Sequence, residues 1–332
     1  MSASLGLQPW MITPEVTRLF DALEAEGGVD CARFVGGCVR NTLLGRDVDD
    51  LDIATRLTPD RVSRAAVAAG GRAVPTGIEH GTVTAVINSR PFEITTLRRD
   101  VSTDGRRAVV AFTEDWGLDA LRRDFTLNTL YASRDGSLHD PTGQGHADAL
   151  AGRIIFVGDP AARIREDALR IMRFFRFLAW YGHGEADPAA LAACADVVAL
   201  VTSLPAERTT KELLKLLDAS DPRHAVRLMS GCGVLDLILT PGGDLDLFDR
   251  LARVETDPAL RLCSLLPQTS PAMAEATEHL RLSNDMRARL VAAVGQDPAI
   301  HGAMSAAEAR AVIYRIGKAS FCDRVRLGRA RA

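Results

Sequence analysis

The sequence predicts an α+β head followed by an all-helical remainder, and two observations carry this prediction. Up to about residue 157, short apolar runs alternate with glycine and turn residues, a pattern typical of strands joined by tight turns. After about residue 159, Ala- and Leu-rich segments with helical periodicity replace that pattern. We therefore expect a small mixed-sheet head over 1–158, a helical neck over 159–220 and a helical body over 221–332.

Individual elements follow from the same patterns. In the head we expect strands at 32–35, 51–54, 82–87 and 92–97, a hairpin turn at 88–91, and helices at 16–26, 37–44 and 59–69. Residues 98–107 are polar without periodicity, which predicts a mobile loop. Beyond the head we expect helices at 163–181, 188–201, 205–218, 221–230, 244–254, 258–266, 272–281, 284–295 and 305–316.

Composition narrows the class of protein. Hydrophobic residues make up 47% of the 332 residues, enough for a sizeable core. The net charge of −3 is not the overall basicity common in nucleic-acid-binding proteins, although arginines gather at 163–176 and 324–331 and could form local basic faces. The six cysteines lack zinc-ligand spacing, and no apolar run is long enough for a signal peptide or a membrane span. We expect a cytoplasmic protein with reduced thiols.

The segment 34–55 has the features of a phosphate-binding turn. A strand leads into Gly36-Gly37, where glycines let the backbone approach a ligand closely, and a helix leaves with its positive N-terminal end toward an anion. Arg40 lies one turn into this helix and could bind phosphate oxygens with its guanidinium. Gly45 stands where the helix is expected to end.

Two acidic residues follow on a predicted strand. Asp50 and Asp52 are two residues apart, so their side chains share one face, where two carboxylates repel each other unless cations lie between them. Two Mg²⁺ ions would fit there and would serve phosphoryl transfer. A lone Asp-x-Asp is usually a solvated edge, but its combination with Gly36-Gly37 within twenty residues is far more specific. We interpret Asp47 and Asp49 as solvated loop residues.

Glu93 lies on the strand after the predicted hairpin. It is either a third carboxylate behind the Asp50–Asp52 pair or an ordinary cross-strand polar residue, and the sequence leaves both open. The segment 122–128 (Arg-Arg-Asp-Phe-Thr-Leu-Asn) is expected to open a helix with Asp124 at its N-cap or in its first turn. A capping cluster with a buried asparagine would explain Asp124 but not the adjacent arginine pair.

These motifs together resemble the class II tRNA nucleotidyltransferase and bacterial poly(A) polymerase family, within the polymerase-β-like nucleotidyltransferases. The resemblance covers 30 to about 220 through six ordered motifs. They are Gly36-Gly37-Cys-Val-Arg40 with Asp50-Leu-Asp52, Gly77-Ile-Glu-His80, Phe92-Glu93-Ile, Asp119-Ala-Leu-Arg122-Arg123-Asp124-Phe-Thr-Leu-Asn128, Asp140-Pro-Thr-Gly143 with Asp148, and Glu166-Asp167-Ala-Leu-Arg170-Ile-Met-Arg173-Phe-Phe-Arg176, followed by Glu207-Arg208.

The resemblance implies roles for single residues. Arg123 would contact the nucleotide, and Asp124 and Asn128 would order its ribose. Asp167 and Arg170 would read the base: a carboxylate accepts from the amino group of cytosine or adenine, where uracil and guanine present carbonyls, and a guanidinium donates to the adjacent ring acceptor. Arg173 and Arg176 would hold phosphate or ribose. A surface helix with i, i+3 salt bridges is the alternative interpretation of this segment.

Three functions stay open at this stage. We favour a CCA-adding enzyme that uses CTP, ATP and Mg²⁺ on the 3′ end and acceptor region of tRNA, with no protein partner evident. The second is a poly(A) polymerase and the third a non-catalytic RNA-binding protein. Two departures from the family pattern are Asn41, where an aspartate is usual, and Gln144-Gly145. We also expect a short C-terminal tail, which leaves the anchoring of tRNA open.

Overall fold

The computed structural model describes residues 3–104, 107–239 and 244–331, which fall into two compact units. One comprises Met1–Glu166 with His183–Asp187, and the other comprises Asp167–Gly182 with Pro188–Ala332. The α/β unit therefore extends to Glu166 rather than 158. The further division of the helical part into neck and body stays a prediction.

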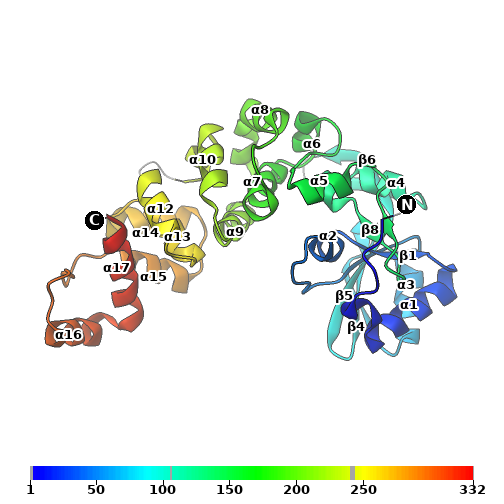
Figure 1. Cartoon of the computed structure of the whole chain (residues 1–332), viewed down its shortest axis with the longest axis horizontal. Coiled ribbons are helices and arrows are strands. Elements are labelled where there is room, and N and C mark those ends of the chain that lie inside the picture. The colour runs from blue at the N-terminus through cyan, green and yellow to red at the C-terminus, as the bar shows by residue number, and fades with distance from the viewer. Residues whose placement is uncertain (1–2, 105–106, 240–243, 332) are drawn as a thin grey trace. The chain divides into compact units, whose positions relative to one another are not determined.

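A mixed sheet forms the centre of the α/β unit (Figure 1). Its seven strands are ordered β3-β4-β5-β2-β1-β8-β9, and β6 and β7 form a separate hairpin. The strand bounds are β1 (Ala32–Val35), β2 (Asp52–Thr55), β3 (Arg72–Gly77), β4 (Thr82–Ile87), β5 (Arg90–Thr96), β6 (Arg98–Asp104), β7 (Arg107–Phe112), β8 (Tyr131–Ala132) and β9 (Leu138–His139). Only β2 and β5 pair in parallel; the other strand pairs of the described residues are antiparallel.

The strand β4 shows why these residues form a sheet. Val83, Ala85 and Ile87 are buried and alternate with half-buried residues, the period of a strand with one face against a core. The turn to β5 is tight, since Asn88 and Ser89 adopt φ of 49° and 65°. Positive φ at both central residues is what a two-residue hairpin turn requires. The predicted hairpin at 88–91 is confirmed.

Helices cover the sheet and complete the core of this unit. They are α1 (Pro14–Gly27), α2 (Gly37–Leu43), α3 (Pro59–Ala68), α4 (Trp116–Leu121), α5 (Gly145–Ala151) and α6 (Pro160–Glu166), with 3₁₀ turns at Pro9–Ile12, Ile78–His80 and Thr126–Asn128. α1 and α3 pack side by side, and α3 also packs against β3 and β4 (Figure 1). The fully buried Phe34 of β1 contacts the rings of Trp10 and Phe20, with centroids 4.7 and 4.6 Å away.

The loop prediction for 98–107 is wrong over the described residues. Arg98–Asp104 is strand β6, and it pairs antiparallel with β7 from Arg107 onward; 105–106 lie outside the described residues. The polar sequence gives no period-2 signal, but the backbone groups of β6 and β7 pair with each other.

The helix predicted over 163–181 is interrupted. α6 ends at Glu166 and α7 begins at Leu169 (Leu169–Tyr181). Between them, Asp167 Oδ1 accepts a hydrogen bond from the backbone N–H of Leu169, two residues on, at 3.0 Å, the local contact of an Asx turn. Arg163 therefore lies on a different helix from Arg170, and Asp167 lies between the two helices. Ile171, Met172, Phe175 and Leu178 of α7 are all buried.

The second unit is entirely helical over its described residues. Its α-helices are α7, α8 (Pro188–Asp196), α9 (Ala206–Leu217), α10 (Arg223–Gly231), α11 (Val234–Ile238), α12 (Leu245–Ala252), α13 (Pro258–Ser264), α14 (Ser270–His279), α15 (Asn284–Ala293), α16 (Ala306–Ile316) and α17 (Lys318–Arg331). The helix predicted at 188–201 ends at Asp196 and is followed by a 3₁₀ segment, Val198–Ser203. α11 and α17 were not predicted. None of the helices described is long and apolar enough to cross a membrane.

A buried arginine on α13 joins several helix ends of this unit. Arg261 is 1% exposed, and its guanidinium donates to five backbone carbonyls. The acceptors lie at the C-terminal end of α9, in Leu217, Ala219 and Ser220, and at that of α12, in Ala252 and Glu255. Carbonyls at helix C-termini lack partners within the helix, so one cation satisfies the ends of two helices.

The arginine cluster predicted as a basic face at 324–331 is largely engaged within the fold. Arg324 donates to the carbonyls of Ala292, Asp297 and Pro298. Arg326 forms an ion pair with Glu255 at 3.1 Å, and Arg331 donates to Gln268. These three side chains therefore hold α17 against its neighbours, which reduces the positive charge they can offer to RNA.

Candidate functional site

The Gly36-Gly37 turn brings two guanidinium groups close to the backbone. Gly36 ends β1 and begins α2 with φ 68° and ψ −117°, a conformation that L side chains rarely adopt. A Cβ at Gly36 would lie 3.8 Å from Nη1 of Arg123, and a Cβ at Gly37 would lie 3.9 Å from Nη2 of Arg40. Backbone amides of a helix start and two arginines thus surround one small space, an arrangement suited to phosphate groups.

Carboxylates lie on and just before the strands next to this turn. Asp52 on β2 lies directly opposite Glu93 on β5 in the parallel register. Asp50 lies two residues before Asp52 and outside β2, so the prediction that both aspartates share a strand is wrong. Asp52 is half-buried, whereas Asp50 and Glu93 are exposed. Burial, the charge of Glu93 and that of Asp50 raise the pKa of Asp52 to about 6, and Arg123 and Arg40 oppose this. Glu93 thus lies close enough to Asp52 to influence its charge.

This donor set fits magnesium in part. Among the described residues, no three His, Cys, Asp or Glu side chains converge closely enough to enclose a metal ion. Magnesium, however, is usually held by one or two carboxylates and completes its shell with water and substrate phosphates. Asp50 and Asp52 provide hard oxygen ligands of that kind, and the crowding of negative charge at Asp52 is what a bound cation would relieve.

Asp124, Asn128 and Arg40 form a buried chain of hydrogen bonds. Arg40 Nη1 donates to Asn128 Oδ1 at 2.5 Å, and Asn128 Nδ2 donates to Asp124 Oδ1 at 2.9 Å. The predicted helix start at 122–128 is wrong, because α4 has just ended at Leu121 and a single 3₁₀ turn, Thr126–Asn128, follows Asp124. The three predicted residues are brought together, but Asp124 binds the asparagine side chain and the N–H of Phe125 instead of capping an α-helix.

Sequence reasoning missed Asp119, which was given no role. This carboxylate is 1% exposed and pairs with Arg122 at 2.7 Å and Arg123 at 3.0 Å, and it accepts the hydroxyl of Tyr131 at 2.7 Å. The two arginines hold the pKa of Asp119 down, at about 2, against the effect of burial. The i, i+3 and i, i+4 spacing of Asp119 to the arginines on one helix end was a signal that could have revealed it.

The other predicted residues belong to the helical unit. Asp167 accepts from the backbone N–H of Leu169, the first residue of α7, and lies 3.7 Å from Arg208 of α9, both partly exposed. Arg170 and Arg173 are on α7, and the Arg173 guanidinium lies 5.4 Å from the ring centroid of Phe177. Arg176 forms a 2.6 Å ion pair with Glu212 of α9 and thereby joins the two helices. Its guanidinium is thus already engaged in packing.

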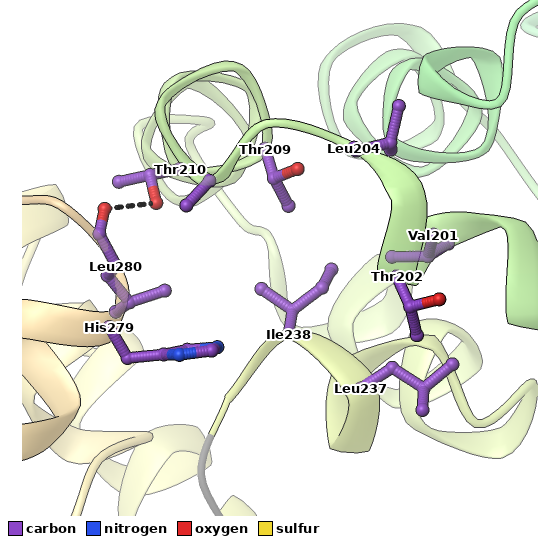
Figure 2. A pocket seen from close by; sticks show the side chains of 10 residues that line it. Val201, Thr202, Leu204, Thr209, Thr210, Leu237, Ile238, His279 and Leu280 are labelled. Carbon is purple, nitrogen blue, oxygen red and sulfur yellow. Dashed lines mark hydrogen bonds between the residues drawn. The ribbon is translucent and has the colours of Figure 1, made fainter. Parts of the chain in front are cut away.

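A pocket of about 250 Å³ also lies in the helical unit. Figure 2 shows it between α9, α11 and the end of α14, with Ile238 and His279 facing inward and the hydroxyl of Thr210 bonded to the carbonyl of Leu280. Its lining is mainly apolar, and it contains none of the residues predicted for catalysis or nucleotide binding. We therefore assign it no part in the site.

A mixed sheet that presents two carboxylates beside a Gly-Gly turn and two arginines is the head of a polymerase-type nucleotidyltransferase. In agreement, residues 32–155 match the model described as "Poly A polymerase head domain". Residues 185–245 match the one described as "Probable RNA and SrmB- binding site of polymerase A". The chain belongs to the family of class II CCA-adding enzymes and poly(A) polymerases.

Curated relatives include the "CCA tRNA nucleotidyltransferase 1, mitochondrial" of Danio rerio, 34% identical over 81% of this chain and 66% of the relative. The Homo sapiens protein of the same name is 40% identical over a region that covers 67% of this chain and 52% of the human protein. The chain thus spans half to two thirds of the length of such relatives. The Bacillus stearothermophilus CCA-adding enzyme in complex with CTP has the same fold, with a TM-score of 0.77 and 25% identity over 97% of this chain and 79% of that structure.

Proposed function

We propose that this chain adds C, C and A to the 3′ end of tRNA from CTP and ATP, with release of pyrophosphate. The observation that carries the proposal is the parallel register that places Asp52 opposite Glu93, beside a Gly36-Gly37 turn flanked by Arg40 and Arg123. Relatives named as CCA-adding enzymes support the product, and a solved structure of that class contains CTP.

The residues of the α/β unit divide the work. Asp50 and Asp52 would hold Mg²⁺, with Glu93 as a third carboxylate. When bound, the ion would supply positive charge to the triphosphate and would lower the pKa of the attacking 3′ hydroxyl. Arg40 and Arg123 bind the triphosphate over the amides of Gly36 and Gly37. Because Asn128 joins Arg40 to Asp124, the group that orders the ribose is fixed relative to the group that binds phosphate.

Base choice is assigned to Asp167, just before α7, and to Arg170 on α7. Asp167 accepts from the amino group of cytosine or adenine, and Arg170 donates to the neighbouring ring acceptor, so that U and G are rejected without a template. The Asp167 Oδ1 atom accepts from the backbone N–H of Leu169, which orients the carboxylate. Arg173 would hold phosphate or ribose, and we assign Arg176 a smaller part because Glu212 already binds it.

Product length tests the proposed function directly. On tRNA that ends before CCA, with CTP and ATP together, we expect three added nucleotides and then a stop, resolved on a sequencing gel. Omission of magnesium is the control and should abolish extension. A ladder of tens of adenosines from ATP alone would instead make the chain a poly(A) polymerase, a possibility that the descriptions of both matching family models keep open.

Base discrimination tests Asp167. Replacing it with alanine should reduce the preference for CTP over UTP by about 10–100-fold, because a good base contact is worth about 1–3 kcal/mol. Steady-state kinetics with all four nucleoside triphosphates measures this. Arg208→Ala is the matched control, since it removes the same 3.7 Å ion pair and leaves the carboxylate in place. Equal loss of preference in both variants would show that the ion pair matters, and not base contact.

We infer tRNA as the partner and the cytoplasm as the compartment. A Thermotoga maritima CCA-adding enzyme complexed with tRNA has a TM-score of 0.72 to this chain, at 18% identity over 96% of the chain and 79% of that structure, which is a likeness of fold. All six cysteines are free thiols, and four of them are buried, as in proteins of a reducing compartment.

A further inference from the structure

We propose that Asp119 is a positioning residue that fixes the Arg123 guanidinium at the nucleotide site. The inference rests on the proposed function and extends it to a residue that touches no reacting group. Asp119 lies on α4, one helical turn before Arg123, and is among the most buried charged side chains of the α/β unit.

The carboxylate binds Arg123 through one oxygen. Oδ2 accepts from Arg123 Nη2 at 3.0 Å and from Nε at 3.3 Å, and the hydroxyl of Tyr131 donates to the same atom at 2.7 Å. The Tyr131 oxygen in turn accepts from Arg123 Nε at 3.3 Å. These contacts occupy Nε and Nη2, while Nη1 is the atom beside Gly36. The guanidinium is planar and rigid, so the atoms held by Asp119 and Tyr131 fix the position of the Nη1 atom at the phosphate-binding turn.

The other oxygen ties the same site to its surroundings. Oδ1 binds Arg122 Nε at 2.8 Å and accepts from the backbone N–H of Arg98, the first residue of β6, at 3.3 Å. From α6, Arg163 Nη2 donates to the carbonyl of Arg123 at 2.8 Å and also to that of Arg122. Both the side chain and the backbone of Arg123 are thus held before any nucleotide arrives, so little ordering entropy is lost on binding.

A neutral replacement separates positioning from charge. Asp119→Asn removes one negative charge beside the triphosphate site, so the charge effect alone would tighten the binding of the anionic nucleotide. Loss of positioning acts in the opposite direction, because Arg123 is then free to turn away from Gly36. We expect the KM for CTP and ATP to rise about 10–100-fold, the range typical of residues that orient a binding group, with a smaller change in kcat.

Asp148→Asn is the matched control for stability. Asp148 is also buried, pairs with Arg153 at 2.7 Å and accepts from Thr126 at 2.6 Å, but its arginine is not at the turn. Both variants should lower the Tm, and only Asp119→Asn should raise the KM. If Asp119→Asn fails to fold, Tyr131→Phe carries the test, since it removes one contact to Arg123 and should raise the KM about 2–10-fold, as expected for one hydrogen bond.

The experiment measures CTP binding with magnesium by calorimetry, alongside kinetics on tRNA lacking CCA. If the wild-type protein binds CTP but extends no RNA, the proposed function is refuted. The role of Asp119 is then still decided by comparing the CTP affinities of the wild type and the variant. An Asp119→Asn variant, or a Tyr131→Phe variant if the first does not fold, that binds CTP as tightly as wild type or more tightly would overturn the inference.

Discussion

Replacing Asp52 with asparagine is expected to abolish nucleotide transfer and to leave the fold intact. The substitution removes one of the two carboxylates proposed to hold magnesium, and we expect kcat to fall by at least about 10³-fold, since each 1.4 kcal/mol of lost transition-state stabilisation is tenfold in rate. Stability should not fall with activity. Asp52 is crowded by Glu93 and Asp50, so a neutral side chain removes like-charge repulsion.

The measurement has two parts. Magnesium-dependent incorporation of CTP gives the rate, and thermal unfolding without magnesium gives the Tm, which should equal or exceed that of the wild type. Asp47→Asn is the matched control, because Asp47 is exposed in the preceding loop and should leave the rate unchanged. Magnesium-dependent turnover of Asp52→Asn within tenfold of wild type would exclude Asp52 as a metal ligand.

Arg261→Met is expected to cause the largest loss of stability. It keeps the apolar bulk of the side chain but leaves five backbone carbonyls without their donor. A buried acceptor left without a donor costs about 1–3 kcal/mol, so the free energy of unfolding should fall by at least about 3 kcal/mol, which for a unit of this size lowers the Tm by roughly 10 °C.

Urea and thermal unfolding followed by circular dichroism measure this loss. Arg250→Met is the matched control. Arg250 is an exposed arginine on α12 whose Nε donates to one backbone carbonyl, that of Ala330. Loss of this hydrogen bond should lower the free energy of unfolding by about 1 kcal/mol. Equal destabilisation by the two variants would mean that the five contacts of Arg261 contribute no more than one.

Local pattern was enough to predict the phosphate-binding turn and most elements near it. The strands β1 and β4 begin and end where apolar periodicity places them, and α2 begins at the Gly36-Gly37 turn as expected. The role of Glu93 could not be predicted from the local sequence. Its position opposite Asp52 depends on β5 pairing in parallel with β2 as well as antiparallel with β4, and strand order is a long-range property that no local window contains.

Other failures have specific physical causes. Periodicity continues from Arg163 to Arg170 as though one helix ran through, but Asp167 competes for the backbone N–H of Leu169 and starts a new helix. From the sequence, Arg261 looks like a residue on the polar face of an amphipathic helix. The neighbouring residues give no sign that two other helices end at its guanidinium. Asp119 was given no role because the motif drew attention to Arg123, which the resemblance implies contacts the nucleotide.

The interruption between α6 and α7 coincides with the boundary between the two compact units, at Glu166 and Asp167. The candidates for binding triphosphate and metal consequently belong to one unit, and the candidates for choosing the base belong to the other. We therefore expect substitutions in the helical unit to alter nucleotide preference while the residues proposed for the chemical step stay unchanged.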